Sequence, residues 1–570
     1  MKKISRRTAV KMLGGAAAAA GLSSAMGGAK TMGQTAAAPA TRPATLPAIP
    51  PAPTPIPAPP GFGVAAGPFQ PTLESLAAFE VPDWYRDAKF GIWAHWGPQC
   101  QPEMGDWYAQ KMYQFNGAIY KFHVQKYGHP SKFGFKDVIN QWKAEKWDPV
   151  ALIALYKRAG AKYFAGMANH HDNMDMFDST YQPWNSVRIG PKKDILAGWS
   201  KAARDAGLRF AVTCHGDHTW DWLQVSRDSD TSGPLAGVPY DGFVTKADGV
   251  GKWWEGLDPQ DLYAQYHPRG HWGWNLSPTG GSPAVDKVYI EKFFNRTIDL
   301  IDKYKPDLLY FDDSIMPIYP TSDIGPRIAA YLYNTSVARE GKVQTVMTGK
   351  DLNAQQRKAL VLDLERGVSG AIDPIPWQTD TCIGNWHYQL SLFQQHKYKT
   401  SLQVVQMLID IVSKNGNLML NIPVKGDGTI DSDETAIVEG IGKWMEPNGE
   451  AIFATRPWQT YGEGPSTVIA GARSRFGGSV DVRAYTAQDV RYTCKGETVY
   501  AFVMGWPADG KVALASLAAG SAKFPKQVGK VELLGSKAPV TFTRDEKALT
   551  VNLPAEKPND YAYALKIVPI

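Results

Sequence analysis

Apolar and polar positions in the middle of the chain repeat in one order: an amphipathic helix, a short turn, a buried strand and then polar residues. "DPVALIALYKRAGA" has apolar residues at the helical period, and the apolar run "KYFAGMANHH" follows it. "DILAGWSKAARDAGL" with "RFAVTCHGDH", and "YIEKFFNRTIDLIDKYKP" with "DLLYFDDS", repeat this order, while "KFGIWAHWG" adds an earlier strand. Strands that alternate with helices predict the parallel sheet of an α/β protein.

Polar side chains follow several of these strands at the point where each strand ends. They are His95, the pair His170 and His171, His215, and the pair Asp312 and Asp313. A β/α barrel brings the C-terminal ends of its strands to the face that carries the active site. An open doubly wound sheet is the alternative, but no glycine fingerprint for a nucleotide occurs. We therefore predict a (β/α)8-like barrel.

The pattern changes on both sides of this region. After about Trp458, short alternating strands lie between turns, as in "STVIAGARSRFGG", "DVRAYTAQDVRYTCKGETVYAFVMGW", "KVELLG" and "PVTFTRDEKALTVNLP". They predict a C-terminal antiparallel β-sandwich. It could bind carbohydrate or only pack against the barrel, and the lack of a site-like cluster in it favours packing. Before the barrel, recurrent proline and scarce large apolar residues predict an extended tether.

The start of the chain predicts export. "MKKISRRTAVKMLGGAAAAAGLSSAMGGA" has a basic front, a short Ala-rich apolar run and then small residues. The run is too short to cross a bilayer. "SRRTAVK" resembles a twin-arginine signal, and an ordinary secretory signal is the alternative. We predict a periplasmic or secreted bacterial protein without a membrane span. Its parts are an export signal (residues 1–33), a Pro/Ala-rich linker (34–68), a barrel catalytic domain (69–458) and a β-sandwich (459–570).

Composition narrows the function. The 570 residues carry a net charge of only +6 and no basic tract, which argues against nucleic-acid binding. The four cysteines are far apart and show no CxxC spacing, which argues against a zinc site or a disulfide framework. The 19 tryptophans supply flat apolar faces that can stack on sugar rings, although tryptophan is also a frequent core residue.

Imidazole and carboxylate groups that converge beside tryptophan suit a sugar, whose hydroxyls need hydrogen-bond partners and whose C–H faces need an aromatic ring. A metal site is the alternative. Consecutive strand side chains point to opposite faces, so His170 and His171 could ligate one ion only if the backbone bends there. No H-E-x-x-H spacing occurs, and "KGDGTIDSDE" lacks the glycine and glutamate of a calcium loop. We predict neither a metal nor a cofactor.

The paired aspartates are the sharpest chemical signal. In "DLLYFDD", Tyr310 and Asp312 share one strand face, and Asp313 lies on the other. A carboxylate fixed at the end of a barrel strand is a candidate nucleophile or base. The alternative is that both aspartates cap the following turn.

At these residues the chain resembles the α-L-fucosidase family, glycoside hydrolase family 29, over roughly Trp84 to Trp458. The matching segments are "WYRDAKFGIWAHWGPQCQPEMGDWYAQKMY", "HHDNMDMFDSTYQPWN", "PDLLYFDDS", "NGNLMLNIPVKGDGTI" and "NGEAIFATRPW". The resemblance implies a β/α barrel followed by a β-sandwich. It also implies an exo-acting enzyme that releases α-linked L-fucose from a fucosylated oligosaccharide or glycoconjugate.

The resemblance implies roles for single residues. Asp312 matches the nucleophile of a retaining hydrolysis, in which a covalent glycosyl-aspartate forms and water then releases it. His95, His170 and His171 match histidines that hold the hydroxyls of fucose. The complete set of predicted sugar-binding residues is His95, Trp96, Asp106, Trp107, His170, His171, His215, Arg366 and Trp386.

The acid that protonates the leaving oxygen departs from the family pattern. Gln378 in "PWQTD" stands where many members have glutamate, and an amide cannot donate this proton. Glu365 in "LERG" is the first candidate, although the adjacent Arg366 is expected to lower its pKa. Asp380 and Glu103 are the alternatives.

Two other functions stay open. One is a glycosidase of the same fold with another sugar specificity, for example towards galactosides. The other, motivated by Gln378, is a sugar-binding relative that has lost catalysis. The sequence leaves the linkage, the natural glycan and the oligomeric state undetermined.

Overall fold

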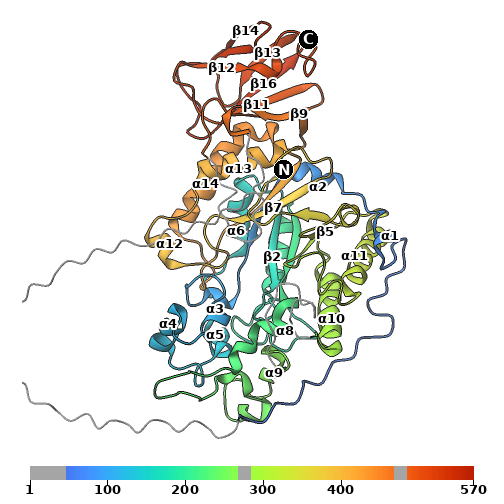
Figure 1. Cartoon of the computed structure of the whole chain (residues 1–570), viewed down its shortest axis with the longest axis vertical. Coiled ribbons are helices and arrows are strands. Elements are labelled where there is room, and N and C mark those ends of the chain that lie inside the picture. Colours follow the sequence, from blue (N-terminus) through green and yellow to red (C-terminus); the bar gives the residue numbers. More distant parts are fainter. Residues whose placement is uncertain (1–45, 268–283, 468–483) are drawn as a thin grey trace, which may run out of the picture. The chain divides into compact units, whose positions relative to one another are not determined.

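The computed structural model describes residues 46–267, 284–467 and 484–570. The predicted export signal and the first part of the predicted linker lie outside these ranges. Eight parallel strands form a closed barrel (Figure 1): β1 (Phe90–Ala94), β2 (Tyr163–Asn169), β3 (Arg209–Cys214), β4 (Leu308–Phe311), β5 (Val346–Gly349), β6 (Val361–Asp363), β7 (Trp377–Cys382) and β8 (Gly416–Asn421). β1 pairs with both β2 and β8, which closes the ring. The barrel prediction is confirmed, and the open-sheet alternative is wrong.

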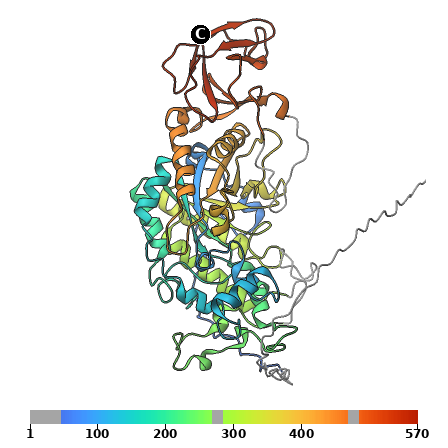
Figure 2. The same ribbon diagram turned by 90° about the vertical axis from the view of Figure 1, so that its left-hand side faces the viewer.

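Helices lie around the strands in both ribbon views (Figures 1 and 2). The helices that precede β2, β3, β4, β5 and β8 are, in order, α6 (Pro149–Arg158), α7 (Ile195–Asp205), α10 (Lys287–Tyr304), α11 (Ile324–Glu340) and α13 (Ser401–Ser413). Helix α14 (Ser432–Asn448) follows β8. A 3-10 turn at Gln356–Lys358 is the connection between β5 and β6, and the fully described stretch between β6 and β7 contains no helix. The β/α repeat is therefore irregular, because the connections from β5 to β6 and from β6 to β7 contain no α-helix.

Short helices fill the long connections. They are α1 (Leu73–Leu76), α2 (Asp83–Ala88), α3 (Tyr108–Lys111), α4 (Ala118–Tyr127), α5 (Phe135–Gln141), α8 (Thr219–Trp222), α9 (Pro259–Leu262) and α12 (Leu390–Gln394). Polar side chains fix where the long helices begin: Asp148, Asp194 and Asp286 each accept a hydrogen bond from the first-turn backbone of α6, α7 and α10.

The C-terminal part is an antiparallel β-sandwich, as predicted. One sheet has the order β13–β16–β11–β10–β9 and the other β12–β15–β14. The strands are β9 (Arg456–Glu463), β10 (Val490–Lys495), β11 (Thr498–Val503), β12 (Lys511–Leu514), β13 (Val528–Leu533), β14 (Thr541–Arg544), β15 (Leu549–Asn552) and β16 (Tyr563–Pro569). Most of the predicted strand "STVIAGARSRFGG" lies outside the described residues.

The hydrophobic core of the barrel continues into this sandwich. Tyr500, Phe502 and Ala564 of the five-stranded sheet belong to the same buried cluster as the barrel strands and their helices. Gln406 of α13 donates a hydrogen bond of 2.7 Å to the carbonyl of Met504. A second buried cluster fills the space between the two sheets. The sandwich thus packs against the barrel.

The end of the predicted linker is bound to the barrel's helices. The Asn334 side chain in α11 donates to the carbonyls of Ala65 (3.0 Å) and Phe69 (2.8 Å) and accepts from the Phe69 N–H (2.9 Å). Gly63 has φ +81° and lies so close to Phe294 that a Cβ would fall 2.2 Å from its ring. Residues 61–69 therefore belong to the folded unit.

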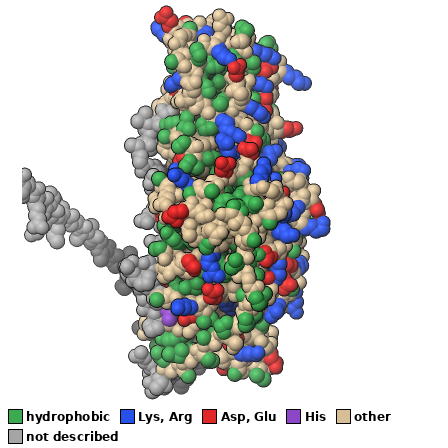
Figure 3. Space-filling model, turned by 90° about the vertical axis from the view of Figure 1, so that its right-hand side faces the viewer, with side chains coloured by type: hydrophobic (Ala, Val, Ile, Leu, Met, Phe, Trp, Pro, Cys, Tyr) green, Lys and Arg blue, Asp and Glu red, His purple; other side chains and the backbone are tan. Residues whose placement is uncertain are grey.

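The surface shows no dominant charge on the face in Figure 3, where acidic and basic side chains are interspersed. Within the described residues, no helix combines the length and apolar character that a membrane crossing requires.

Candidate active site

A cavity of about 530 Å³ opens at the C-terminal ends of the barrel strands. It is lined by Trp93, His95, Asp106, Trp107, Lys111, His170, His215, Tyr310, Asp312, Glu365, Arg366, Asp380, Asn385, Trp386 and His387. Its size suits a small ligand, and its lining combines aromatic faces with polar groups. Trp107 (φ 64°) and Arg366 (φ 46°) both have left-handed backbone conformations, which are costly for bulky side chains and cluster at functional sites.

The structure brings together nearly all of the predicted site residues. Those that line the cavity are His95, Asp106, Trp107, His170, His215, Asp312, Glu365, Arg366 and Trp386. His171 lies next to them, with its Nε2 3.7 Å from an Asp312 oxygen.

Trp96 is the exception, and its assignment is corrected. Trp93 and His95 line the cavity, whereas Trp96, two residues beyond the end of β1, does not. Its ring packs on those of Trp142 and Trp199, and its Nε1 donates to the Lys425 carbonyl. Trp96 is therefore a core residue between the barrel and its helices.

The adjacent histidines share one side of the chain. β2 ends at Asn169, and the ring centroids of His170 and His171 lie 4.3 Å apart. A turn at His171 and Asp172 follows the strand, and this is the backbone bend under which both histidines can reach one ligand. Among the described residues, His95–His170–His387, His170–His171–His215 and Asp217–His218–Asp313 bring potential metal-ligand atoms within 4.8 Å of one another.

The surroundings of His95 and His170 favour their neutral imidazole forms. Burial, reinforced by neighbouring imidazoles, holds the pKa of His95 and His170 well below the usual value. The Gln99 amide nitrogen lies 2.7 Å from Nδ1 of His170, while the Gln99 oxygen accepts from the Ala109 N–H. The Nε2–H of His170 is thus left to donate. Neither ring nitrogen of His95 hydrogen-bonds another of the described residues.

Asp312 is held in its ionised form. Burial opposes ionisation, but the Lys350 ammonium at 2.7 Å and the His215 imidazole at 3.2 Å outweigh it. The pKa of Asp312 therefore lies well below its ordinary value. Asp313 does not line the cavity; it accepts hydrogen bonds from the backbone of Ser314 and Ile318.

Glu365 has the opposite shift. Burial, aided by the nearby charges of Asp380 and Asp312, raises its pKa although Lys350 works against this. Lys350 Nζ lies 2.7 Å from an oxygen of Glu365, as it does from Asp312. Arg366, expected to lower this pKa, instead turns toward the ring of Trp386 at 5.1 Å and the sulfur of Cys382.

The other candidate acids are placed differently. Gln378 lies inside the barrel, where it hydrogen-bonds Tyr85, Tyr163 and Asp363 and does not line the cavity. Asp380 lines the cavity and accepts a 2.9 Å hydrogen bond from Tyr310. Glu103 is absent from the described lining of the cavity.

Comparisons with known proteins agree with this site and fold. The family model described as "Alpha-L-fucosidase" matches residues 62–450, and the model "Alpha-L-fucosidase C-terminal domain" matches residues 484–568.

The chain belongs to the α-L-fucosidase family.

Individual fucosidases are distant from this member of the family. The tissue α-L-fucosidase of Rattus norvegicus is 24% identical over 89% of this chain and 94% of its own length. The plasma α-L-fucosidase of Homo sapiens is 26% identical over 85% and 88%. A solved Thermotoga maritima α-fucosidase, bound to a mechanism-based inhibitor, shares the fold with a TM-score of 0.65 and 24% identity, over 88% of this chain and all of that one. Family membership makes the chain a glycoside hydrolase.

Several residues in or beside the cavity of this fucosidase-family site were not predicted from the sequence. Lys350 directly follows β5, so the strand-end rule that found the histidines would have found it. Trp93 and Tyr310 lie two residues before His95 and Asp312 on the same strand faces. His387 and Asn385 flank Trp386 on a loop, where no periodic signal exists.

Proposed function

We propose that the protein is an exported, exo-acting α-L-fucosidase that works by retention through a covalent intermediate on Asp312. The observation that carries this proposal is the pair Asp312 and Glu365, whose surroundings shift their pKa values in opposite directions. Two carboxyl groups separated in this way suit a nucleophile that must be charged and an acid that must be protonated.

The spacing of the pair supports retention. One Lys350 nitrogen lies 2.7 Å from an oxygen of each carboxylate, so these two oxygens are no further apart than twice that distance. Retaining glycosidases hold their carboxyl groups about 5–5.5 Å apart, whereas inverting enzymes need about 6.5–9.5 Å to admit a water.

The reaction then has two balanced steps. An Asp312 oxygen attacks the anomeric carbon while protonated Glu365 gives its proton to the glycosidic oxygen, and the C–O bond breaks. The aglycone leaves as an alcohol, and a fucosyl ester of Asp312 remains. Glu365, now a carboxylate, takes a proton from water, whose oxygen displaces Asp312 from the same face from which the aglycone left.

The remaining lining supports binding of a deoxy sugar. Neutral imidazoles can donate or accept hydrogen bonds through their ring nitrogens, so the cluster of His95, His170 and His215 suits vicinal hydroxyls. Trp386 lies 5.3 Å from Trp93, ring to ring, and this aromatic wall suits an apolar face or methyl group. The substrate is then a fucosylated oligosaccharide or glycoconjugate reached outside the cytoplasm, as the predicted export signal implies.

The experiment compares matched glutamine variants on fucosides with good and poor leaving groups. Glu365→Gln should lower kcat/KM on a poor leaving group by about 100- to 10,000-fold and much less on an aryl fucoside, because only the poor leaving group needs the proton. Glu103→Gln, outside the cavity, should retain activity on both. Equal losses on the two substrates would remove Glu365 from the acid role.

A substrate panel tests the sugar itself. Wild-type enzyme should hydrolyse aryl α-L-fucosides faster than the matching galactosides, because a 6-hydroxyl would press against the Trp386 wall. Faster turnover of a galactoside would favour the changed-specificity alternative, and no turnover of any glycoside would favour the sugar-binding one.

A further inference from the structure

The loop that carries the two histidines after β2 is held from outside the barrel by one arginine. Arg296 lies in α10 and is buried, with only 3% of its surface exposed. Its Nε and Nη2 donate to the two oxygens of Asp175 at 3.1 and 2.6 Å, and its Nη1 donates to the Asn173 oxygen at 2.6 Å. A planar guanidinium can hold both partners at once, which a lysine ammonium cannot do with the same geometry.

Asp175 passes this constraint to the next strand. Its Oδ1 accepts a 3.0 Å hydrogen bond from the Asn169 amide at the end of β2. The Asn169 oxygen in turn accepts from the backbone N–H groups of His215 (3.1 Å) and Gly216 (3.0 Å) after β3. His215 is the imidazole that lies 3.2 Å from the Asp312 oxygen. Three hydrogen-bonded contacts therefore connect Arg296 with the backbone of His215.

The loop between these anchors needs external support. Asn173 has φ +67°, a left-handed conformation, and its amide donates to the carbonyls of Asp261 and Leu262. Burying an ion pair is weak support for stability, because desolvation offsets most of the attraction. The buried Arg296–Asp175 pair is better explained as a contact that holds His170, His171 and His215 in their positions around Asp312.

We propose that Arg296 is a positioning residue for the nucleophile's imidazole neighbours, acting through Asp175 and Asn169. The proposal rests on Asp312 being the nucleophile, as in the proposed function. Arg296 is not among the residues that line the active-site cavity. Its described side-chain hydrogen bonds go to Asp175 and Asn173, not to Asp312.

Lys303 supplies a matched control. It lies two turns further along α10 and ties the same loop through the Asp178 carbonyl (2.5 Å) and Thr180 (3.0 Å). These contacts lie beyond Asp175, away from Asn169. Lys303→Met should therefore cost loop contacts without disturbing His215.

The experiment compares Arg296→Met with Lys303→Met well below the melting temperature of both. Arg296→Met should lower kcat/KM about 10- to 100-fold, as misplaced catalytic groups do. The acid limb of its pH profile should move to higher pH, because a displaced His215 no longer helps to keep Asp312 ionised. Lys303→Met should leave both unchanged. Equal profiles for the two variants, with active wild type, would overturn the positioning role and leave the proposed function standing.

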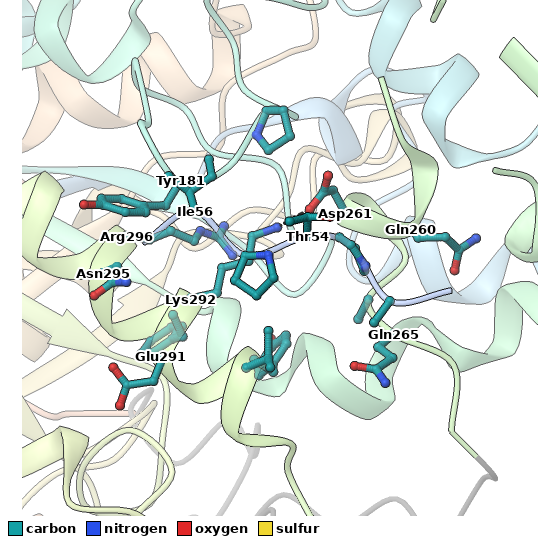
Figure 4. Close-up of a pocket in the computed structure, with 18 of the residues that line it drawn as sticks. Thr54, Ile56, Tyr181, Gln260, Asp261, Gln265, Glu291, Lys292, Asn295 and Arg296 are labelled. Atoms are coloured by element: carbon teal, nitrogen blue, oxygen red, sulfur yellow. Dashed lines mark hydrogen bonds and ion pairs between the residues drawn. The ribbon is translucent and has the colours of Figure 1, made fainter. Parts of the chain in front are cut away.

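A chemical rescue sharpens the test. Arg296 also lines a second cavity, of about 420 Å³, between α10 and the segment that contains Thr54 and Ile56 (Figure 4). In Arg296→Ala this cavity would extend into the vacated site, so millimolar guanidinium should restore part of kcat/KM. Guanidinium should not rescue Asn169→Ala, because that change interrupts the hydrogen-bonded path to His215 between Asp175 and His215. Rescue of neither variant, or of both, would contradict a hydrogen-bonded path from Arg296 through Asp175 and Asn169 to His215.

A structural readout keeps the proposal testable without turnover. In a crystal structure of Arg296→Met, the His215 ring should leave hydrogen-bonding distance of Asp312, whereas in Lys303→Met it should stay. If Arg296→Met does not fold, Arg296→Lys serves in its place, because it keeps the charge and loses the bidentate contact. An unmoved His215 in a folded Arg296 variant would overturn the proposal.

Discussion

Lys350 is the residue on which the electrostatics of the site depend most visibly. Its ammonium lies 2.7 Å from an oxygen of Asp312 and 2.7 Å from an oxygen of Glu365. Burial opposes the charge of Lys350, but the two carboxylates outweigh it and raise the pKa of Lys350 well above its usual value. It lowers the pKa of each carboxyl group. Lys350 therefore favours the charged nucleophile and opposes the protonated acid, so it sets the pH range in which both forms coexist.

Replacing this lysine should move both limbs of the pH profile in one direction. Asp312 must be ionised, so activity falls as pH drops through its pKa; Glu365 must be protonated, so activity falls as pH rises through its pKa. Without the positive charge both pKa values rise, and in Lys350→Met both limbs of kcat/KM should move to higher pH. Lys350→Arg, which keeps the charge, should leave them in place. Limbs that move apart or stay fixed in Lys350→Met would contradict this role.

At the scale of single elements, side-chain alternation explains both what the sequence revealed and what it hid. It could not decide the position of Trp96, because β1 ends at Ala94 and Trp96 lies two residues beyond that end. One residue beyond β2 it no longer holds, so His170 and His171 come together. Element boundaries decide such assignments, and they are the least certain product of sequence reasoning.

The junction between α13 and β10 depends on a buried ionic group. Asp410 of α13 accepts from Lys414 at 2.7 Å and from Arg491 of β10 at 2.6 Å, and all three side chains are almost fully buried. Burial raises the pKa of Asp410, but the two cations outweigh this and lower it. Its contribution to stability is therefore present above the unfolded-state pKa and is lost as pH falls through the folded-state one.

Removing this carboxylate should loosen the C-terminal sandwich from the barrel. Asp410→Asn removes the carboxylate that both buried cations contact and should lower the free energy of unfolding by about 3–5 kcal/mol, measured by urea denaturation. The exposed pair Lys201–Asp205 on α7 is the control, since Lys201→Ala should cost no more than about 0.5 kcal/mol. A loss in Asp410→Asn as small as in the control would show that the junction does not depend on this group.

For the whole molecule, the periodic pattern was sufficient to predict a closed barrel followed by a sandwich. The chemistry was less accessible. Strand ends supplied Asp312 and the histidines, but Lys350, which contacts Asp312 and Glu365, and His387 of the cavity lining were missed. Glu365 became the acid candidate only because the family resemblance showed that Gln378 stands where many members have the acid. No local pattern could show that residues 61–69 dock on α10 and α11, because Asn334 and Phe294, which hold them, are more than two hundred residues away in the chain.

In the proposed mechanism, Asp312 carries the sugar between the two chemical steps. The most direct measurement incubates the enzyme with a 2-fluoro-fucoside bearing a good leaving group, which slows the second step, and locates the added fucosyl mass by peptide mass spectrometry. One label per chain is expected, on Asp312, and no label in Asp312→Asn. A label on Glu365 or Asp380, or hydrolysis without any covalent adduct and with inverted product, would contradict it.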